Sequence, residues 1–209
     1  MVDIEALDTG RYHAMVIQDP NDKRNIRGFF HFSQAQSVTM RNSDVWNDIG
    51  RHAKAIARLV EAVNRYTQIR CDVARVLTFD SAELFKMPFV LTCTRYPFEL
   101  VPGEAESLGR YLLSGGFLMT DASYHGNQQP GLWALHTMII QALETQGLHE
   151  DRDYTFEKLP NSHALYHCYF DFPNGPPTAG DHIEITRKEN SRPYDYLEAV
   201  EIEGWLVVI

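Results

Sequence analysis

Hydrophobic residues recur at helical spacing in three stretches of the chain. In residues 46–63 the apolar positions follow one another at steps of three and four, so they share one face of a helix. Further apolar stripes follow Pro102 and Pro130, and proline is favoured in the first turn of a helix. Glycines 115–116 and Gly147 close these two stretches, as expected where the backbone turns left-handed after a helix. The pattern therefore predicts three helices.

Short apolar runs between the helices are typical of strands that are buried on both faces of a parallel sheet, above all residues 89–93 and 117–120. The runs that precede them are strand-like as well: residues 12–18, 27–33 and 69–77. Strands that alternate with helices predict an α/β fold with a doubly wound, mostly parallel sheet of the flavodoxin-like kind. The last third predicts a more antiparallel part, with candidate strands at residues 154–158, 167–172, 183–187, 197–201 and 205–209.

Length and charge limit the domain organisation and the classes of partner that we expect. The 209 residues fit a single domain, 1–209, with residues 1–26 as a leading strand or extension and residues 27–209 as the core. A net charge of −9, from 19 basic and 28 acidic side chains, argues against a nucleic-acid partner. No run approaches the roughly 20 apolar residues of a membrane span, and the first residues do not resemble an export signal. We therefore expect a soluble protein, with a removed export signal left open.

The cysteines do not form a disulfide pattern. There are three of them, and an odd, sparse count argues against a disulfide framework. Cys71 and Cys168 lie in apolar, strand-like runs, so we expect both to be buried core thiols.

The stretch YLLSGGFLMTD at residues 111–121 combines a helix end, a glycine pair and a hydrophobic strand. This combination resembles the class I glutamine amidotransferase-like proteins, including their trehalose-utilisation-type branch. Three further segments are similar to one bacterial domain family of unknown function with that fold: LFKMPFV at 84–90, PNSHALYHCYFDF at 160–172 and NGPP at 174–177. The resemblance covers residues 27–209 and implies a fold without an established activity.

In the amidotransferases that this chain resembles, a cysteine nucleophile lies on a sharp turn after the strand that follows the glycine pair. Matching the chain by its glycines puts Ala122 at that position, and alanine carries no nucleophile. The resemblance therefore implies a domain that does not hydrolyse glutamine by the usual cysteine route. The family usually continues beyond a strand like residues 205–209, so we expect the natural chain to extend past Ile209.

The first candidate site is the segment 121–125, because ligands of doubly wound sheets bind beyond the carboxyl ends of the strands. It offers a carboxylate, a hydroxyl, a phenol and an imidazole, from Asp121, Ser123, Tyr124 and His125. Ser123 and His125 can act as nucleophile and base, and Tyr124 can contact a ligand. The alternative is that Asp121 and Ser123 only cap the following helix.

Cys93 and Arg95 end the preceding strand, so we expect them to lie beside Asp121. Cys93 is an alternative nucleophile if its thiolate is stabilised by a neighbouring cation. Arg95 can bind the carboxylate or phosphate of a ligand. Ser33 ends an early strand and can line the same crevice. In the alternative interpretation, Cys93 is a small core residue and Arg95 a surface arginine.

A third set of polar residues does not predict a metal site: His163, His167, Asp171 and His182. His163 and His167 are four residues apart, and in an extended segment such residues lie about 13 Å apart. Solvated or capping histidines are the preferred interpretation, and no metal or other cofactor is expected.

Two classes of function follow from these residues. We prefer a non-catalytic module that binds a small ligand or a protein partner in the strand-end crevice, because Ala122 occupies the nucleophile position. The alternative is a hydrolase that uses Ser123 or Cys93 with His125 and Asp121. A structural interaction domain is a third possibility, and it predicts an exposed apolar patch in place of a pocket.

Overall fold

The computed structural model describes residues 14–42, 46–94, 96–122, 130–176 and 196–209. Several residues named above lie outside these ranges, namely Arg95, Ser123, Tyr124, His125, His182 and the expected strand 183–187.

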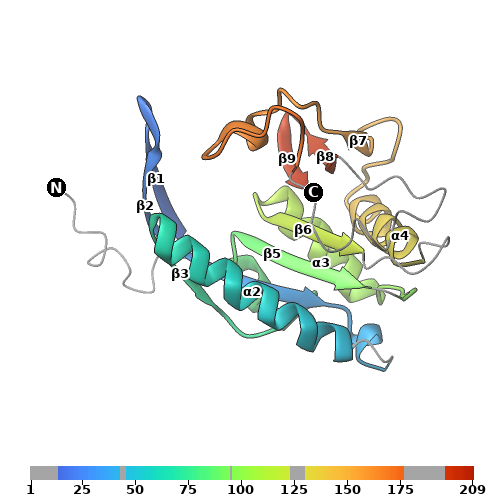
Figure 1. The fold of residues 1–209 in the computed structure, drawn as a ribbon. Helices are drawn as coiled ribbons and strands as arrows, with labels where there is room; N and C mark the ends of the chain where they lie inside the picture. The colour runs from blue at the N-terminus through green and yellow to red at the C-terminus, as the bar shows by residue number, and fades with distance from the viewer. Residues whose placement is uncertain (1–13, 43–45, 95, 123–129, 177–195) are drawn as a thin grey trace, which may run out of the picture.

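Within the described residues, nine strands form one sheet (Figure 1). Its main path follows the order β1 (Ala14–Asp19), β2 (Asp22–Gln36), β5 (Phe89–Thr94), β6 (Phe117–Ala122), β9 (Trp205–Val208), β8 (Glu198–Ile202) and β7 (Glu157–Lys158). Two more strands pair with β2 off this path, β3 (Gln68–Val73) and β4 (Leu77–Thr78).

The central pairs of the sheet are parallel, from β3, β4 and β5 on β2 to β6 on β5 and β9 on β6. Antiparallel strands complete both ends, β1 beside β2 and β8 and β7 beyond β9. This confirms the predicted mixed α/β class with a mostly parallel central sheet and a more antiparallel C-terminal part.

All three predicted helices are present: α2 (Trp46–Tyr66), α3 (Pro102–Leu113) and α4 (Pro130–Glu144). Helix α2 covers one face of the sheet, and α3 and α4 cover the other (Figure 1). Shorter 3-10 helices lie between strands, η1 (Val38–Asn42), η2 (Ala82–Lys86) and η3 (Ala164–His167).

Alternation along β5 divides the core into two layers. Val90 belongs to the large cluster under α3 and α4, while Phe89 and Leu91 pack with the cluster under α2. On the next strand Leu118 joins the large cluster, and Phe117 stacks on Phe89 with ring centroids 5.4 Å apart. Because successive side chains of a strand point to opposite faces, the direction of every later residue in β5 and β6 follows from these contacts.

The glycine pair after α3 has a structural explanation. Gly115 has φ of +94°, a conformation that ends the helix and that residues with a Cβ rarely adopt. A Cβ on Gly116 would lie 2.3 Å from the ring of Tyr111, which is buried beneath the start of β6. The Tyr111 hydroxyl donates to the Phe117 carbonyl oxygen at 3.1 Å. The pair therefore positions β6 whether or not a catalytic turn follows it.

The predicted strand at residues 167–172 is wrong. The 3-10 helix η3 turns Tyr166 into the core, where its hydroxyl accepts a hydrogen bond from Leu197 N at 3.1 Å. Phe172 N then donates to Tyr166 O at 2.9 Å and closes a loop, so Cys168 is exposed and not buried as expected. Here the apolar spacing reflects two anchor residues of a loop, and no sheet pairing forms.

Two other predicted strands are shorter than expected. The segment 154–158 contributes only Glu157–Lys158 to the sheet, and the run 69–77 is divided between β3 and β4. No helix of the described residues is apolar over a length that would cross a bilayer.

Candidate functional site

The carboxyl ends of β2, β5 and β6 lie side by side, since β5 pairs in parallel with both neighbours. The register sets Cys93 opposite Asp121 and Thr94 opposite Ala122. Alternation then assigns Cys93 and Asp121 to the face under α2, and Thr94 and Ala122 to the face under α3 and α4. This edge of the sheet therefore presents two different surfaces.

The surface under α2 is polar but closely packed around Cys93. Only 3% of Cys93 is exposed, and the side-chain amide of Gln34 donates to its sulfur at 3.6 Å. Of the described histidines, none forms a hydrogen bond with this thiol. The described contacts of Cys93 are therefore close burial and one hydrogen bond from an amide.

A buried carboxylate holds the segment directly after β2 in place through hydrogen bonds. Glu104, in the first turn of α3, is fully buried and accepts hydrogen bonds from Ser37 Oγ at 2.6 Å and Val38 N at 2.7 Å. Val101 N donates to the same carboxylate at 3.3 Å. Ser33 is also fully buried, and its hydroxyl donates to Arg75 O at 2.7 Å. These polar groups are engaged within the protein.

The surface under α4 contains a cavity of about 330 Å³ between β6, α4, β8 and β9. Its walls are mainly apolar, formed by Leu132, Leu135, Ile139, Phe156, Val200 and Val208. Thr120, Asp121 and Ala122 bring the carboxyl end of β6 to the cavity, so it lies where doubly wound sheets bind ligands.

One polar pair, His136 and Glu198, is set into these walls. His136 Nε2 lies 2.5 Å from Glu198 Oε1, and the imidazole stacks on Phe156 with ring centroids 4.2 Å apart and planes 18° apart. Both side chains are partly exposed, His136 to 25% and Glu198 to 35%. The carboxylate and the phenyl ring together fix the orientation of the imidazole.

Two atoms of this pair remain available to a ligand. Among the described residues, neither His136 Nδ1 nor Glu198 Oε2 has a hydrogen-bond partner. An ionised carboxylate only accepts hydrogen bonds, so Nε2 carries the proton that binds Glu198 and a neutral ring leaves Nδ1 as an acceptor. The nearby Thr120 hydroxyl already donates to Ile209 O at 3.1 Å. With a neutral imidazole the pair therefore offers two acceptors.

Sequence reasoning missed this pair for a physical reason. His136 and Glu198 are separated by 62 positions and come from a helix and a strand that only the fold brings together. The one local signal is that His136 follows Leu132 by four residues and so lies on the apolar stripe of α4. An imidazole on a buried stripe needs a polar partner, but the sequence does not identify it.

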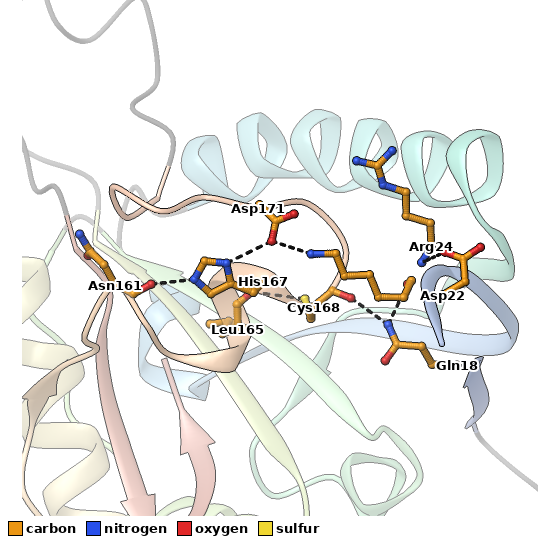
Figure 2. A network of polar contacts seen from close by, with 9 residues as sticks. Gln18, Asp22, Arg24, Asn161, Leu165, His167, Cys168 and Asp171 are labelled. Carbon is orange, nitrogen blue, oxygen red and sulfur yellow. Dashed lines mark hydrogen bonds and ion pairs between the residues drawn. The ribbon is translucent and has the colours of Figure 1, made fainter. Parts of the chain in front are cut away.

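Two residues of the set considered above for a metal site, His167 and Asp171, belong to a surface network (Figure 2). His167 Nδ1 lies 3.2 Å from Asp171 Oδ1, and His167 Nε2 lies 2.9 Å from Asn161 O. Lys23 Nζ binds the same Asp171 oxygen at 2.5 Å, so the β1–β2 hairpin is joined to the loop after η3. Lys23 and then His167 lower the pKa of the Asp171 carboxyl through their hydrogen bonds.

This network does not have the form of a metal site. His163 Nδ1 accepts a hydrogen bond from Leu165 N at 3.2 Å, and its Nε2 lies 3.6 Å from Glu201. His163 thus caps η3 and does not join His167 and Asp171. Within the ranges that the structure describes, no three histidine, cysteine or carboxylate side chains converge on one point.

The chain was compared with known proteins and with models of protein families. No curated protein sequence matches it. A family model described as a domain of unknown function, DUF4159, matches residues 36–209 and so most of the chain. On this match, the chain belongs to the DUF4159 family of domains of unknown function.

Proposed function

We propose that this domain is a non-catalytic binding module and that the cavity between β6, α4, β8 and β9 holds a small ligand. The observation that carries the proposal is a space of about 330 Å³ with mainly apolar walls and one oriented polar pair, His136 and Glu198. Small-molecule sites are concave, mainly apolar, carry a few fixed polar groups and measure roughly 300–1,000 Å³. A protein partner would need a broader exposed surface than this cavity offers.

The proposal includes the finer form of the fold, the class I glutamine amidotransferase-like variant of the flavodoxin-like sheet. The glycine pair before β6 and the parallel order of β2, β5 and β6 support it. In that form Ala122 stands where the enzymes carry their nucleophile, and Ala122 borders the cavity. A ligand in this cavity would therefore meet a methyl group at that point, which favours binding over catalysis.

The proposal is tested with indole, a neutral ring compound that fits the cavity, in an NMR titration. The wild-type protein is compared with Ile139→Phe, which places a larger side chain in the cavity wall. We expect saturable binding by the wild type and at least about tenfold weaker binding by the variant. Equal binding by both proteins, or no binding by either, contradicts the proposal.

A second candidate, a hydrolase, is favoured by one observation. The imidazole of His136 is held by the carboxylate of Glu198, as the base of a serine hydrolase is held by its carboxylate partner. Ser123 follows Ala122 directly in the sequence and is the nucleophile of this candidate, with Asp121, His125 and Cys93 as the further residues suggested by the sequence.

The two candidates are separated by a fluorophosphonate probe, which forms a covalent bond only with an activated serine. For the binding module we expect no labelling in the intact mass of the protein. Labelling that disappears in Ser123→Ala and in His136→Ala would overturn the binding module and establish the hydrolase.

A further inference from the structure

The polar pair in the cavity under α4 offers hydrogen-bond acceptors, and these indicate the chemistry of its ligand. Glu198 Oε2 is an acceptor, and His136 Nδ1 is an acceptor when the imidazole is neutral. The Thr120 hydroxyl has its proton engaged by Ile209 O and can also only accept. No lysine or arginine is among the described residues that line the cavity. The phenol of Tyr196 also lines the cavity and can both donate and accept. A ligand that binds the acceptors of the polar pair must bring its own donor.

The charge of the cavity agrees with this. Its described lining includes the carboxylate of Glu198 and no basic side chain other than the imidazole. Asp121 borders the cavity from a position on β6 whose side chain points to the α2 face. Glu198 is 35% exposed, and a ligand that covers it must replace the water around the carboxylate. A cationic donor does so with a charge-assisted hydrogen bond, whereas an anionic ligand would meet like charge.

The walls indicate a flat and apolar body. The imidazole of His136 and the ring of Phe156 both line the cavity and stack on each other nearly in parallel, at 18°. Offset stacking of a ligand ring on such a surface adds to its apolar burial. An apolar cavity of roughly 150 Å³ holds benzene, so about 330 Å³ has room for one or two rings with a short side chain.

We propose that the cavity binds an arylalkylamine, a one- or two-ring aromatic compound with a short chain ending in a protonated amine. The ring lies against Phe156 and the apolar side of α4, and the ammonium donates to Glu198 Oε2. This inference rests on the proposed function, because it names the ligand class of the same cavity. It excludes carboxylates and phosphates of similar size.

The experiment uses three compounds with the same ring system and different charge. Tryptamine is cationic, indole is neutral and indole-3-acetate is anionic, and each is titrated into the wild-type protein in NMR experiments at roughly physiological salt. Because the chain has a net charge of −9, each titration is repeated with Ile139→Phe to identify attraction that does not involve the cavity.

We expect tryptamine to bind at least about tenfold more tightly than indole, and indole more tightly than indole-3-acetate. Glu198→Gln keeps an oxygen that can accept from His136 but removes the charge, so it should abolish the preference for tryptamine over indole. Glu201→Gln is the matched control, since Glu201 lies on the same strand but does not line the cavity. It should leave all three affinities unchanged.

Other outcomes overturn one of the two proposals and identify which one. If indole binds in the cavity but the three compounds bind equally, or the anion binds best, the ligand class is wrong and the binding module stands. If Glu201→Gln weakens tryptamine binding as much as Glu198→Gln does, the preference is a general charge effect and the ligand class is again wrong. If no compound distinguishes the wild type from Ile139→Phe, the proposed function itself fails.

Discussion

The two faces of the sheet differ sharply at its carboxyl edge. Under α2, the polar residues Gln34 and Cys93 lie side by side, but they contact each other in a closely packed region. Under α4, the surroundings are mostly apolar, and a cavity of about 330 Å³ contains the oriented pair His136–Glu198. The comparison teaches that residues with reactive side chains mark a site only where the fold also leaves space for a ligand.

The strongest test of this contrast removes the carboxylate that fastens the end of β2. Glu104→Ala leaves three donors without their acceptor, so we expect a loss of about 3 kcal/mol or more in the free energy of unfolding, measured in urea. The loosened edge should also make Cys93 react faster with a thiol reagent.

The matched control for this change is Glu106→Ala, on an exposed position of the same helix. It should alter the free energy of unfolding by less than about 0.5 kcal/mol. Similar losses in the two variants would show that Glu104 does not hold this edge closed.

Two substitutions on α4 test whether the space beside this helix is an open cavity or a packed core. Ile139 and Leu143, one turn further along, are both buried in the core, but only Ile139 also lines the cavity. We expect Leu143→Phe to cost about 1–3 kcal/mol through overpacking, and Ile139→Phe to cost less because the ring enters existing space. Thermal unfolding of both variants measures the difference, and an equal or larger cost at Ile139 would argue against an open cavity.

The smallest effect is expected for Cys93→Ala. The change removes one buried sulfur, so we expect a loss of about 1 kcal/mol and unchanged indole affinity. In the wild type, one exposed thiol, Cys168, should react quickly with a thiol reagent, while Cys71 and Cys93 react slowly. Burial and the nearby Asp72 raise the pKa of Cys71, which further lowers its thiolate fraction. Loss of indole binding in Cys93→Ala would move the site to the α2 face.

The parts of the fold that depend on neighbouring residues could be predicted from the sequence. The end of α3 at Gly115 and Gly116 follows from a backbone that needs φ above zero and from the space taken by Tyr111. The buried strands β5 and β6 follow from continuous apolar runs. The strand prediction for residues 167–172 failed because a loop anchored by the buried Tyr166 and the partly buried Phe172 has the same apolar spacing as a strand.

The candidate site could be predicted only in part. The rule that ligands bind at the carboxyl ends of parallel strands leads to Asp121 and Ala122, and both border the cavity. It does not lead to Glu198, because nothing in the sequence states that β8 passes beside α4. His136 and Glu198 are 62 residues apart in the sequence, and only tertiary packing brings them into contact.

The central claim, that ligands enter the α4 face and not the α2 face, is tested most directly by methyl NMR during an indole titration. The methyl groups of Ile139 and Val200 report on the cavity, and those of Ile56 and Val60 report on the core under α2. We expect saturable shifts at Ile139 and Val200 with little change at Ile56 and Val60. Shifts confined to Ile56 and Val60, or none at any of the four, would contradict the account.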